Sequence, residues 1–270
     1  MSIFLEKFIS MLMSVIDAYT HVGVADPSVL EGFRPIEEKG CSISKILENM
    51  EMANVDKTVI IPVHHWEYPE ANREIARLVE KYPEKLVGFG RVDPNCPECA
   101  YDVAREAVKD LGLRGIEVSG FQWVNYDPAI ACPLFERLFT LGVPILVRGD
   151  VDYSFVQRAL PQIVERFRDK TIIAALSPWT GLGFYYPPYR ELLIDMARIS
   201  RNFYLIISTV VMTRSVEEIV LRVGARQVIF GSNAPYSHPT YEIARIESLN
   251  LTDEEKRLIL GGNIARILEV

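Results

Sequence analysis

The chain is poor in the features that mark several specialised classes of protein. Its 270 residues contain four cysteines, which is too few for a disulfide scaffold of this length. It has no run of lysine and arginine and its net charge is −7, so a nucleic-acid-binding surface is not expected. No stretch reaches the ~20 apolar residues of a membrane span, so stable membrane insertion is not expected either. With 49% hydrophobic and 24% charged residues, the composition predicts a soluble globular protein, which we expect in the cytoplasm.

Two of the cysteines form a C-x-x-C pattern, Cys96-Pro97-Glu98-Cys99. A structural zinc site needs a second pair of ligands, and the remaining cysteines do not supply one. We interpret the pattern as two ordinary thiols at the start of a helix. A local disulfide or redox pair is the alternative.

Residues 1–13 are apolar apart from Glu6 and Lys7, and they precede the first predicted strand. We interpret them as an N-terminal extension, which arises from an upstream start codon or forms an extra helix packed on the main domain. A helix that binds a partner or lies on a membrane surface is the alternative. The main domain is predicted over 14–270.

Eight short runs of apolar and β-branched residues recur along this domain, and most are continuous rather than alternating. Such runs are typical of parallel strands that are covered on both faces. The runs are 14–19, 58–63, 86–92, 113–118, 143–147, 171–175, 202–208 and 227–231.

Segments with helical periodicity separate these runs, among them 154–167, and two further helices end the chain. Regular alternation of this kind indicates βα units, and eight of them indicate one closed (β/α)8 barrel, a TIM barrel in the α/β class. A doubly wound open sheet is the alternative, but no Gly-x-Gly-x-x-Gly follows the first strand. The longest gap, 23–42, is expected to form a loop over the barrel mouth.

Several phrases at the predicted strands resemble those of one known family. They are Asp17-Ala18-Tyr19-Thr20-His21 in the first strand, 87–94 in the third, 111–116 before the fourth, 141–147 at the fifth, Gly231-Ser232-Asn233-Ala234-Pro235 after the eighth, and 262–268 in the last helix. The chain thus resembles the amidohydrolase superfamily, in the amidohydrolase-related branch that includes aminocarboxymuconate-semialdehyde decarboxylase. The resemblance implies a barrel of the metallo-dependent hydrolase type, with hydrolase or carboxy-lyase activity.

The resemblance also implies a divalent metal such as zinc at the C-terminal barrel mouth. Its ligands would come from a His-x-His pair in the first strand, a His ending each of the fifth and sixth strands, and an Asp after the eighth. Here those positions hold Tyr19 and His21, Arg148, a His-free segment 174–179, and Asn233. His21 is the ligand that is retained, so the metal site is degenerate.

The replacements oppose metal binding for physical reasons. The Arg148 guanidinium stays protonated, and a +1 charge about 4 Å from a dication costs roughly 8 kcal/mol at an effective dielectric constant near 20. Asn233 cannot act as a general base, although it can orient a water or donate to an oxyanion. We therefore expect no metal cofactor at the family position. A relocated site built from His21, His64 or His65, and Glu117 is the alternative.

Polar side chains nevertheless collect at the predicted C-terminal ends of the strands, where this fold builds its sites. They are Tyr19, His21, His64, His65, Trp66, Arg91, Asp93, Glu117, Arg148, Asp150 and Asn233. Two arginines in one pocket indicate an anionic ligand, most simply a carboxylate. We assign substrate binding to Arg148, Arg91, Tyr19 and Glu117, and catalysis to His21, His64 and Asn233. An ion pair between Glu117 and either arginine, as a structural substitute for the metal, is the alternative role of that glutamate.

The sequence therefore predicts a metal-independent hydrolase or lyase that acts on a small carboxylated substrate. Two alternatives stay open: a non-catalytic barrel relative with a binding or scaffold role, and a divalent-metal-dependent hydrolase or decarboxylase with a relocated metal. The expected partner is a small anionic molecule, and assembly into a homo-oligomer is left open.

Overall fold

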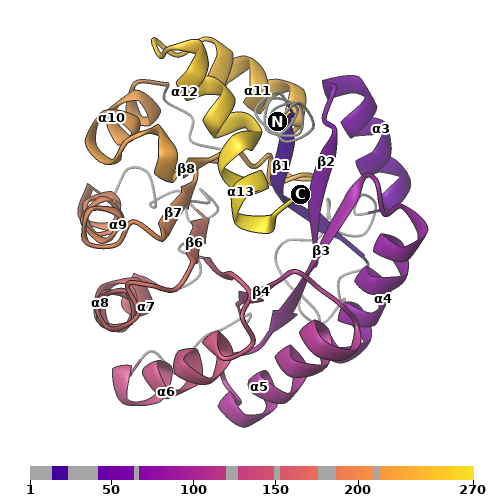
Figure 1. The fold of residues 1–270 in the computed structure, drawn as a ribbon, viewed down its shortest axis with the longest axis vertical. Helices are drawn as coiled ribbons and strands as arrows, with labels where there is room; N and C mark the ends of the chain where they lie inside the picture. Colours follow the sequence, from indigo (N-terminus) through magenta and orange to yellow (C-terminus); the bar gives the residue numbers. More distant parts are fainter. Residues whose placement is uncertain are drawn as a thin grey trace, which may run out of the picture.

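Eight parallel strands form the centre of the molecule, as Figure 1 shows. The computed structural model describes residues 14–23, 42–63, 67–119, 127–148, 153–175, 187–208 and 213–270. The strands follow one another in chain order: β1 (Ile16–Val22), β2 (Lys57–Pro62), β3 (Leu86–Val92), β4 (Gly115–Val118), β5 (Ile145–Arg148), β6 (Ile172–Ala175), β7 (Phe203–Ile206) and β8 (Val228–Ile229).

The last strand returns to the first and closes the sheet. The backbone N–H of Ala18 donates to the carbonyl of Phe230 at 3.1 Å, and that of His21 donates to the carbonyl of Ala234 at 2.7 Å. A parallel bridge also joins Thr20 to Ala234. These bonds confirm the predicted (β/α)8 barrel.

Helices surround the strands on the outside (Figure 1). They are α3 (Ile43–Ala53), α4 (Tyr68–Lys81), α5 (Pro97–Arg105), α6 (Pro128–Phe139), α7 (Tyr153–Arg158), α8 (Leu160–Arg166), α9 (Pro187–Ile199), α10 (Thr213–Val223), α11 (Pro239–Glu247), α12 (Asp253–Arg257) and α13 (Asn263–Leu268). The π-helical turns η1 (Glu106–Asp110) and η3 (Leu258–Gly262) and the 3-10 turn η2 (Ala225–Gln227) complete the described elements. None of the described helices is long and apolar enough to cross a bilayer.

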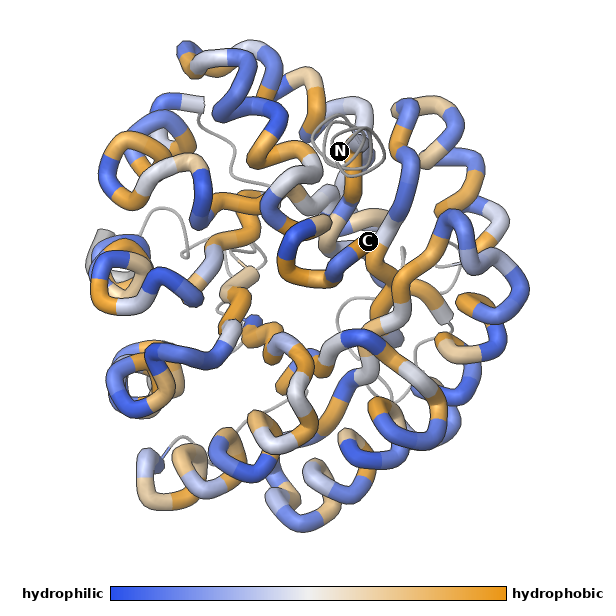
Figure 2. Tube along the Cα trace, in the orientation of Figure 1, coloured by the Kyte–Doolittle hydropathy of each residue, from blue (hydrophilic) through white to orange (hydrophobic). Residues whose placement is uncertain are grey.

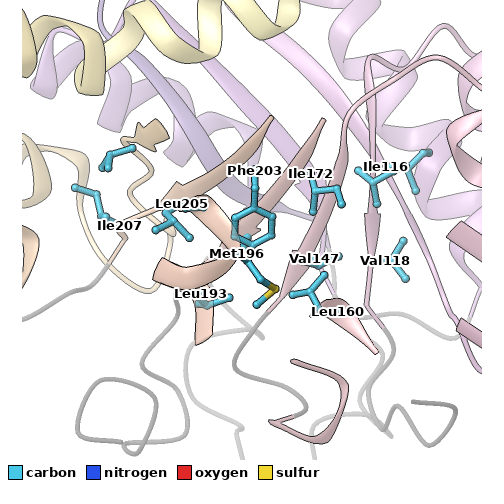
Figure 3. Packing of buried hydrophobic residues seen from close by; sticks show 14 of the residues in the cluster. Ile116, Val118, Val147, Leu160, Ile172, Leu193, Met196, Phe203, Leu205 and Ile207 are labelled. Atoms are coloured by element: carbon cyan, nitrogen blue, oxygen red, sulfur yellow. The ribbon is translucent and has the colours of Figure 1, made fainter. Parts of the chain in front are cut away.

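The strand side chains divide between two apolar layers because successive residues of a strand point to opposite faces. The outward layer packs against the helices: Figure 3 shows Val147, Ile172 and Phe203 of the strands in one cluster with Met196 of α9. The inward layer fills the barrel and includes Val59 and Phe89. In Figure 2 the strands are mostly hydrophobic in colour, while the surrounding helices alternate between hydrophobic and hydrophilic positions.

Helix α13 closes the amino-terminal end of the barrel. Its Ile264 and Leu268 belong to the inward apolar layer together with Ile16 and Tyr204 of the strands. The opposite, carboxyl end is therefore the end at which polar side chains can meet.

Most predicted strands differ from the structure by one or two residues at an end, and two differences are larger. β1 reaches Val22 because its pairing with β2 continues to the Val22–Pro62 register pair. The helix predicted over 154–167 is split into α7 and α8. Proline near the start of α8 explains the break, since it has no backbone N–H to continue the helix. Residues 1–13 lie outside the described part of the chain.

The prediction that Cys96 and Cys99 are two ordinary thiols was wrong. Cys96 and Cys99 form a disulfide at the start of α5, which is the alternative that the C-x-x-C spacing left open. Cys132 is a buried free thiol.

Candidate functional site

A fully buried ion pair lies at the centre of the candidate site. Register places Arg91 of β3 beside Glu117 of β4. Both Nε and Nη2 of Arg91 donate to Oε2 of Glu117, at 2.9 and 2.6 Å, and the two side chains are 1% and 0% exposed. Asn72 of α4 fixes the strand at this point: it accepts from the Arg91 N–H at 2.8 Å and donates to the Arg91 carbonyl at 3.1 Å.

The charge of Arg91 is secured by its partner. Burial works to lower the pKa of the guanidinium, but the negative charge of Glu117 outweighs it, so the pKa lies above its usual value. Tyr68 and Tyr19 also raise this pKa, and the charge of Arg148 lowers it. The site therefore keeps a fixed cation in the barrel lumen.

Arg148 ends β5 on the other side of the same glutamate. Its Nε lies 3.9 Å from Oε1 of Glu117. Its side chain is 10% exposed, whereas the side chains of Glu117 and Arg91 are sealed inside the barrel. Among the predicted substrate-binding residues, Arg148 is thus the one with the most accessible charge.

His21 lies at the end of β1 between two aromatic rings. Its ring centroid is 4.7 Å from that of Tyr19 and 5.8 Å from that of Tyr236, both in edge-on geometry. Burial lowers the pKa of His21 well below 6.5, and the positive charges of Arg91 and Arg148 lower it further. A polar contact with the Asn233 side chain opposes this shift but does not reverse it. His21 is consequently a neutral imidazole at neutral pH.

Asn233 is held by an unusual backbone. Its φ is 58°, in the left-handed region that asparagine tolerates better than most residues. Its N–H donates to the carbonyl of Tyr19 at 2.8 Å, and a cis peptide bond follows between Ala234 and Pro235. These features turn the chain after β8 toward the end of β1, which brings Asn233 to His21.

Asp17 lies deeper along β1 and accepts two backbone hydrogen bonds. Its Oδ1 accepts from the N–H of Ser232 at 2.8 Å and from that of Tyr19 at 3.2 Å. Burial raises the pKa of Asp17 to about 7, against these bonds and with a smaller contribution from the charge of Glu242. Asp17 thereby ties β1 to the segment that carries Asn233.

Several polar atoms at this end of the barrel are buried and lack a hydrogen bond of normal geometry to any described residue. They are both ring nitrogens of His21, Nη1 of Arg91, Oε1 of Glu117, Oγ of Ser119, and both side-chain atoms of Asn233. Buried polar groups in folded proteins are nearly always satisfied, because leaving one unpaired costs about 1–3 kcal/mol. Their concentration at one end of the barrel marks it as a site for a polar ligand.

The described residues do not fit a divalent metal at the family position. No group of three or more His, Cys, Asp and Glu side chains in the described ranges is arranged to hold a metal ion. Of the residues at the ligand positions, His21 alone offers a strong neutral donor, while Arg148 brings a positive charge.

The structure brings together six of the seven residues predicted for the site: Tyr19, His21, Arg91, Glu117, Arg148 and Asn233. His64, together with His65, Trp66 and Asp150, lies outside the described residues. Asp93 accepts from the N–H of Asn95 at 2.9 Å and so braces a turn.

Two residues that contact the site were not predicted from the sequence. Tyr236 packs on His21, and its only sequence signal is its place directly after the Gly-Ser-Asn-Ala-Pro phrase. Asn72, on a helix far from any motif, gave no signal, because its role depends on how α4 packs against β3.

Comparison with known proteins agrees with this architecture. The amidohydrolase family profile matches residues 50–270. A gamma-resorcylate decarboxylase of Polaromonas is 23% identical over 252 residues, with 74% of this chain and 75% of that protein covered. A 2-amino-3-carboxymuconate-6-semialdehyde decarboxylase of Dictyostelium discoideum is 25% identical over 128 residues, with 43% and 36% covered.

Solved structures share the fold as well. A dihydroxybenzoic acid decarboxylase from Polaromonas, with bound manganese and the inhibitor 2-nitroresorcinol, superposes with a TM-score of 0.71 at 18% identity, covering 95% of this chain and 97% of that one. The fold, the order of the motifs and the profile match over most of the length lead to one conclusion. The chain belongs to the amidohydrolase family.

Proposed function

We propose that this protein is a metal-independent enzyme that acts on a small carboxylated substrate, and that its reaction is of the carboxy-lyase type. The observation that carries the proposal is the set of buried polar atoms at the carboxyl end of the barrel that make no hydrogen bond of normal geometry to a described residue. Buried donors on Arg91, Ser119 and Asn233 beside the Arg148 charge suit a carboxylate that enters the barrel.

The chemistry of these groups favours a lyase over a hydrolase. Hydrolysis requires a base that takes a proton from water, and Asn233 cannot do so. His21 is a weak base, because burial and two guanidinium groups hold its pKa well below 6.5. Several relatives that match most of this chain are decarboxylases, among them the gamma-resorcylate and dihydroxybenzoic acid decarboxylases of Polaromonas, which supports the same choice.

In the proposed reaction, Arg148 binds the substrate carboxylate and fixes its direction. The bond between the carboxyl carbon and the ring carbon breaks, carbon dioxide leaves, and the electron pair stays on the ring carbon. That carbon then takes a proton from a water molecule, and the hydroxide ion that remains combines with the released carbon dioxide to give bicarbonate. The neutral His21 and the Asn233 amide orient the water and the remaining substrate oxygens, and Tyr19 packs against His21 to keep its ring in place.

Metal independence is part of the proposal and has its own support. A dication at the family position would stand close to Arg148, in a place where a carboxylate ligand has become Asn233. The manganese in the Polaromonas decarboxylase is a property of that protein.

The test begins with protein purified without chelators or metal-affinity resin. Its metal content is measured, and 2,6-dihydroxybenzoate and related hydroxybenzoates are incubated with it while released carbon dioxide is recorded. We expect turnover with less than about a tenth of an equivalent of metal, since the +1 charge of Arg148 opposes a dication by several kcal/mol. Turnover should also be unchanged by EDTA.

Two variants with the same change of charge test whether the activity depends on the candidate site. Arg148→Gln should lower kcat/KM about 100-fold, the scale expected for losing one charged contact to the substrate. Arg105→Gln, an exposed arginine on α5, makes the same change of charge and should leave kcat/KM unaltered. Activity that EDTA abolishes and manganese restores would favour a relocated metal site, and absence of both turnover and binding of these acids would favour a non-catalytic role.

A further inference from the structure

A cleft lies at the opposite end of the barrel from the candidate active site. It has a volume of about 630 Å³ and is lined by three arginines from separate segments. Arg201 precedes β7, Arg226 lies in η2 directly before β8, and Arg266 lies on α13. All three positions are at the amino-terminal ends of the strands, so this cleft is separate from His21 and Asn233.

The three guanidinium groups have spare hydrogen-bond donors. Neither Arg201 nor Arg226 makes a side-chain hydrogen bond or an ion pair with any residue in the described ranges. Arg266 makes two long contacts, to the Arg226 carbonyl and to Oδ1 of Asn263, both at 3.3 Å. By contrast, Arg222 nearby is held by Glu191 at 2.6 Å. In a chain with a net charge of −7, the three arginines outnumber the two glutamates in the lining of the cleft, which therefore carries a net positive charge.

Two buried amides fix the segments that carry these arginines. Nε2 of Gln227 lies within hydrogen-bond distance of the carbonyls of Ala197, Ser200 and Phe203, at 2.7, 2.9 and 2.8 Å, which ties η2 to the start of β7. Nδ2 of Asn263 donates to the carbonyls of Ala225 and Val228, both at 2.7 Å, which ties α13 to the same turn. The backbones that bear the arginines are therefore preorganised relative to one another.

The rest of the lining indicates what else a ligand would carry. Glu254 and Glu255 stand on the α12 side of the cleft. Glu255 already accepts from the backbone and hydroxyl of Thr252, at 2.9 and 2.8 Å. Glu254 has no such bond among the described residues and can accept from a hydroxyl group. Tyr204, which is 7% exposed, offers a small apolar surface.

We propose that this cleft binds the phosphate group of a small hydroxylated phosphate ester. Three guanidinium groups match the three terminal oxygens of a phosphate monoester, since each can donate paired hydrogen bonds to them. A carboxylate, with two oxygens, would leave at least one arginine unused. Glu254 then receives a hydroxyl group of the same ligand.

The probe for the test is inorganic phosphate, titrated into the intact protein by calorimetry in a zwitterionic buffer. We expect a dissociation constant on the order of 1 mM, which corresponds to about 4 kcal/mol. Arg201→Gln with Arg226→Gln should weaken binding at least about tenfold, or about 1.4 kcal/mol. The control is Arg105→Gln with Arg214→Gln, which removes two exposed arginines outside this cleft and should change the constant less than about twofold.

The outcomes are decisive because all four arginines are exposed and their loss should not unfold the protein. No measurable binding of phosphate to the unaltered protein, or equal weakening in the two double variants, would overturn the site. Glycerol phosphate should bind more tightly than inorganic phosphate, and Glu254→Leu should remove that advantage because leucine has no hydrogen-bond acceptor. Equal affinity for the two probes would overturn the assignment to a hydroxylated ester.

Discussion

Glu117 and Arg91 hold each other inside the barrel, with Oε2 of the carboxylate bonded to two nitrogens of the guanidinium and neither side chain more than 1% exposed. A pair sealed in this way resists the loss of either member, because the remaining charge would be buried alone. We expect Glu117→Gln to lower the free energy of unfolding by about 3–5 kcal/mol, measured by urea denaturation. Glu117→Leu with Arg91→Met should recover most of that loss.

The matched control for this prediction is an exposed pair. Glu136 and Arg166 lie 2.8 Å apart and are each 54% exposed. Water screens such a pair, so Glu136→Gln should cost less than about 1 kcal/mol. Similar costs for the buried and exposed substitutions would show that the Arg91–Glu117 pair does not hold the barrel together.

The raised pKa of Asp17 predicts a dependence of stability on pH. Burial puts this pKa at about 7 in the folded protein, against 3.8 for an ordinary aspartate. The folded state therefore binds the proton more tightly, so the stabilisation is complete below about pH 4 and is lost as the pH rises through 7. The difference between the two pKa values corresponds to about 4 kcal/mol.

His21 acts in the opposite sense over part of the same range, since its lowered pKa makes the folded state bind its proton less tightly. The measurement is therefore a difference: unfolding free energies of the unaltered protein and of Asp17→Asn, compared from pH 4 to 8. We expect the variant to gain relative stability steadily as the pH rises. A difference that does not vary with pH would mean that Asp17 is ionised throughout.

A glycine beneath the ion pair leads to a prediction about packing. A Cβ atom placed on Gly115 would lie 2.4 Å from Cζ of Phe89, inside the barrel. Gly115→Ala should therefore displace the Phe89 ring and lower the free energy of unfolding by about 1–3 kcal/mol. Gly115→Ala with Phe89→Leu should restore part of it, as measured by thermal unfolding. If the single variant is as stable as the unaltered protein, the ring has room to move.

The sequence predicted the fold well because barrel strands are continuous apolar runs, a pattern that does not depend on distant contacts. It predicted less about which side chains contact one another inside the barrel. Glu117 was expected to pair with Arg148 or Arg91. The structure shows an ion pair with each, and the β3–β4 register, which sets Arg91 opposite Glu117, makes the contact with Arg91 the closer one. The ring of Tyr236 reaches His21 because the chain turns at Asn233 after β8, a conformation that a residue pattern does not encode.

The loss of metal ligands predicts that they can be put back. The family positions hold Tyr19, Arg148 and Asn233 around the retained His21. Tyr19→His, Arg148→His and Asn233→Asp together would supply four donors of the types that zinc and manganese accept, and would remove the opposing charge. We expect the triple variant to retain close to one equivalent of metal after dialysis, measured by elemental analysis.

The control for this experiment tests whether the small number of ligands or the charge of Arg148 prevents metal binding. Tyr19→His with Asn233→Asp leaves Arg148 in place and still offers three donors, which is enough for a catalytic zinc site. The guanidinium should nevertheless oppose the dication by roughly 8 kcal/mol at 4 Å, so this double variant should hold far less metal than the triple variant. Equal metal content in the two would mean that Arg148 turns away from the ligand position, and that missing donors alone account for the degenerate site.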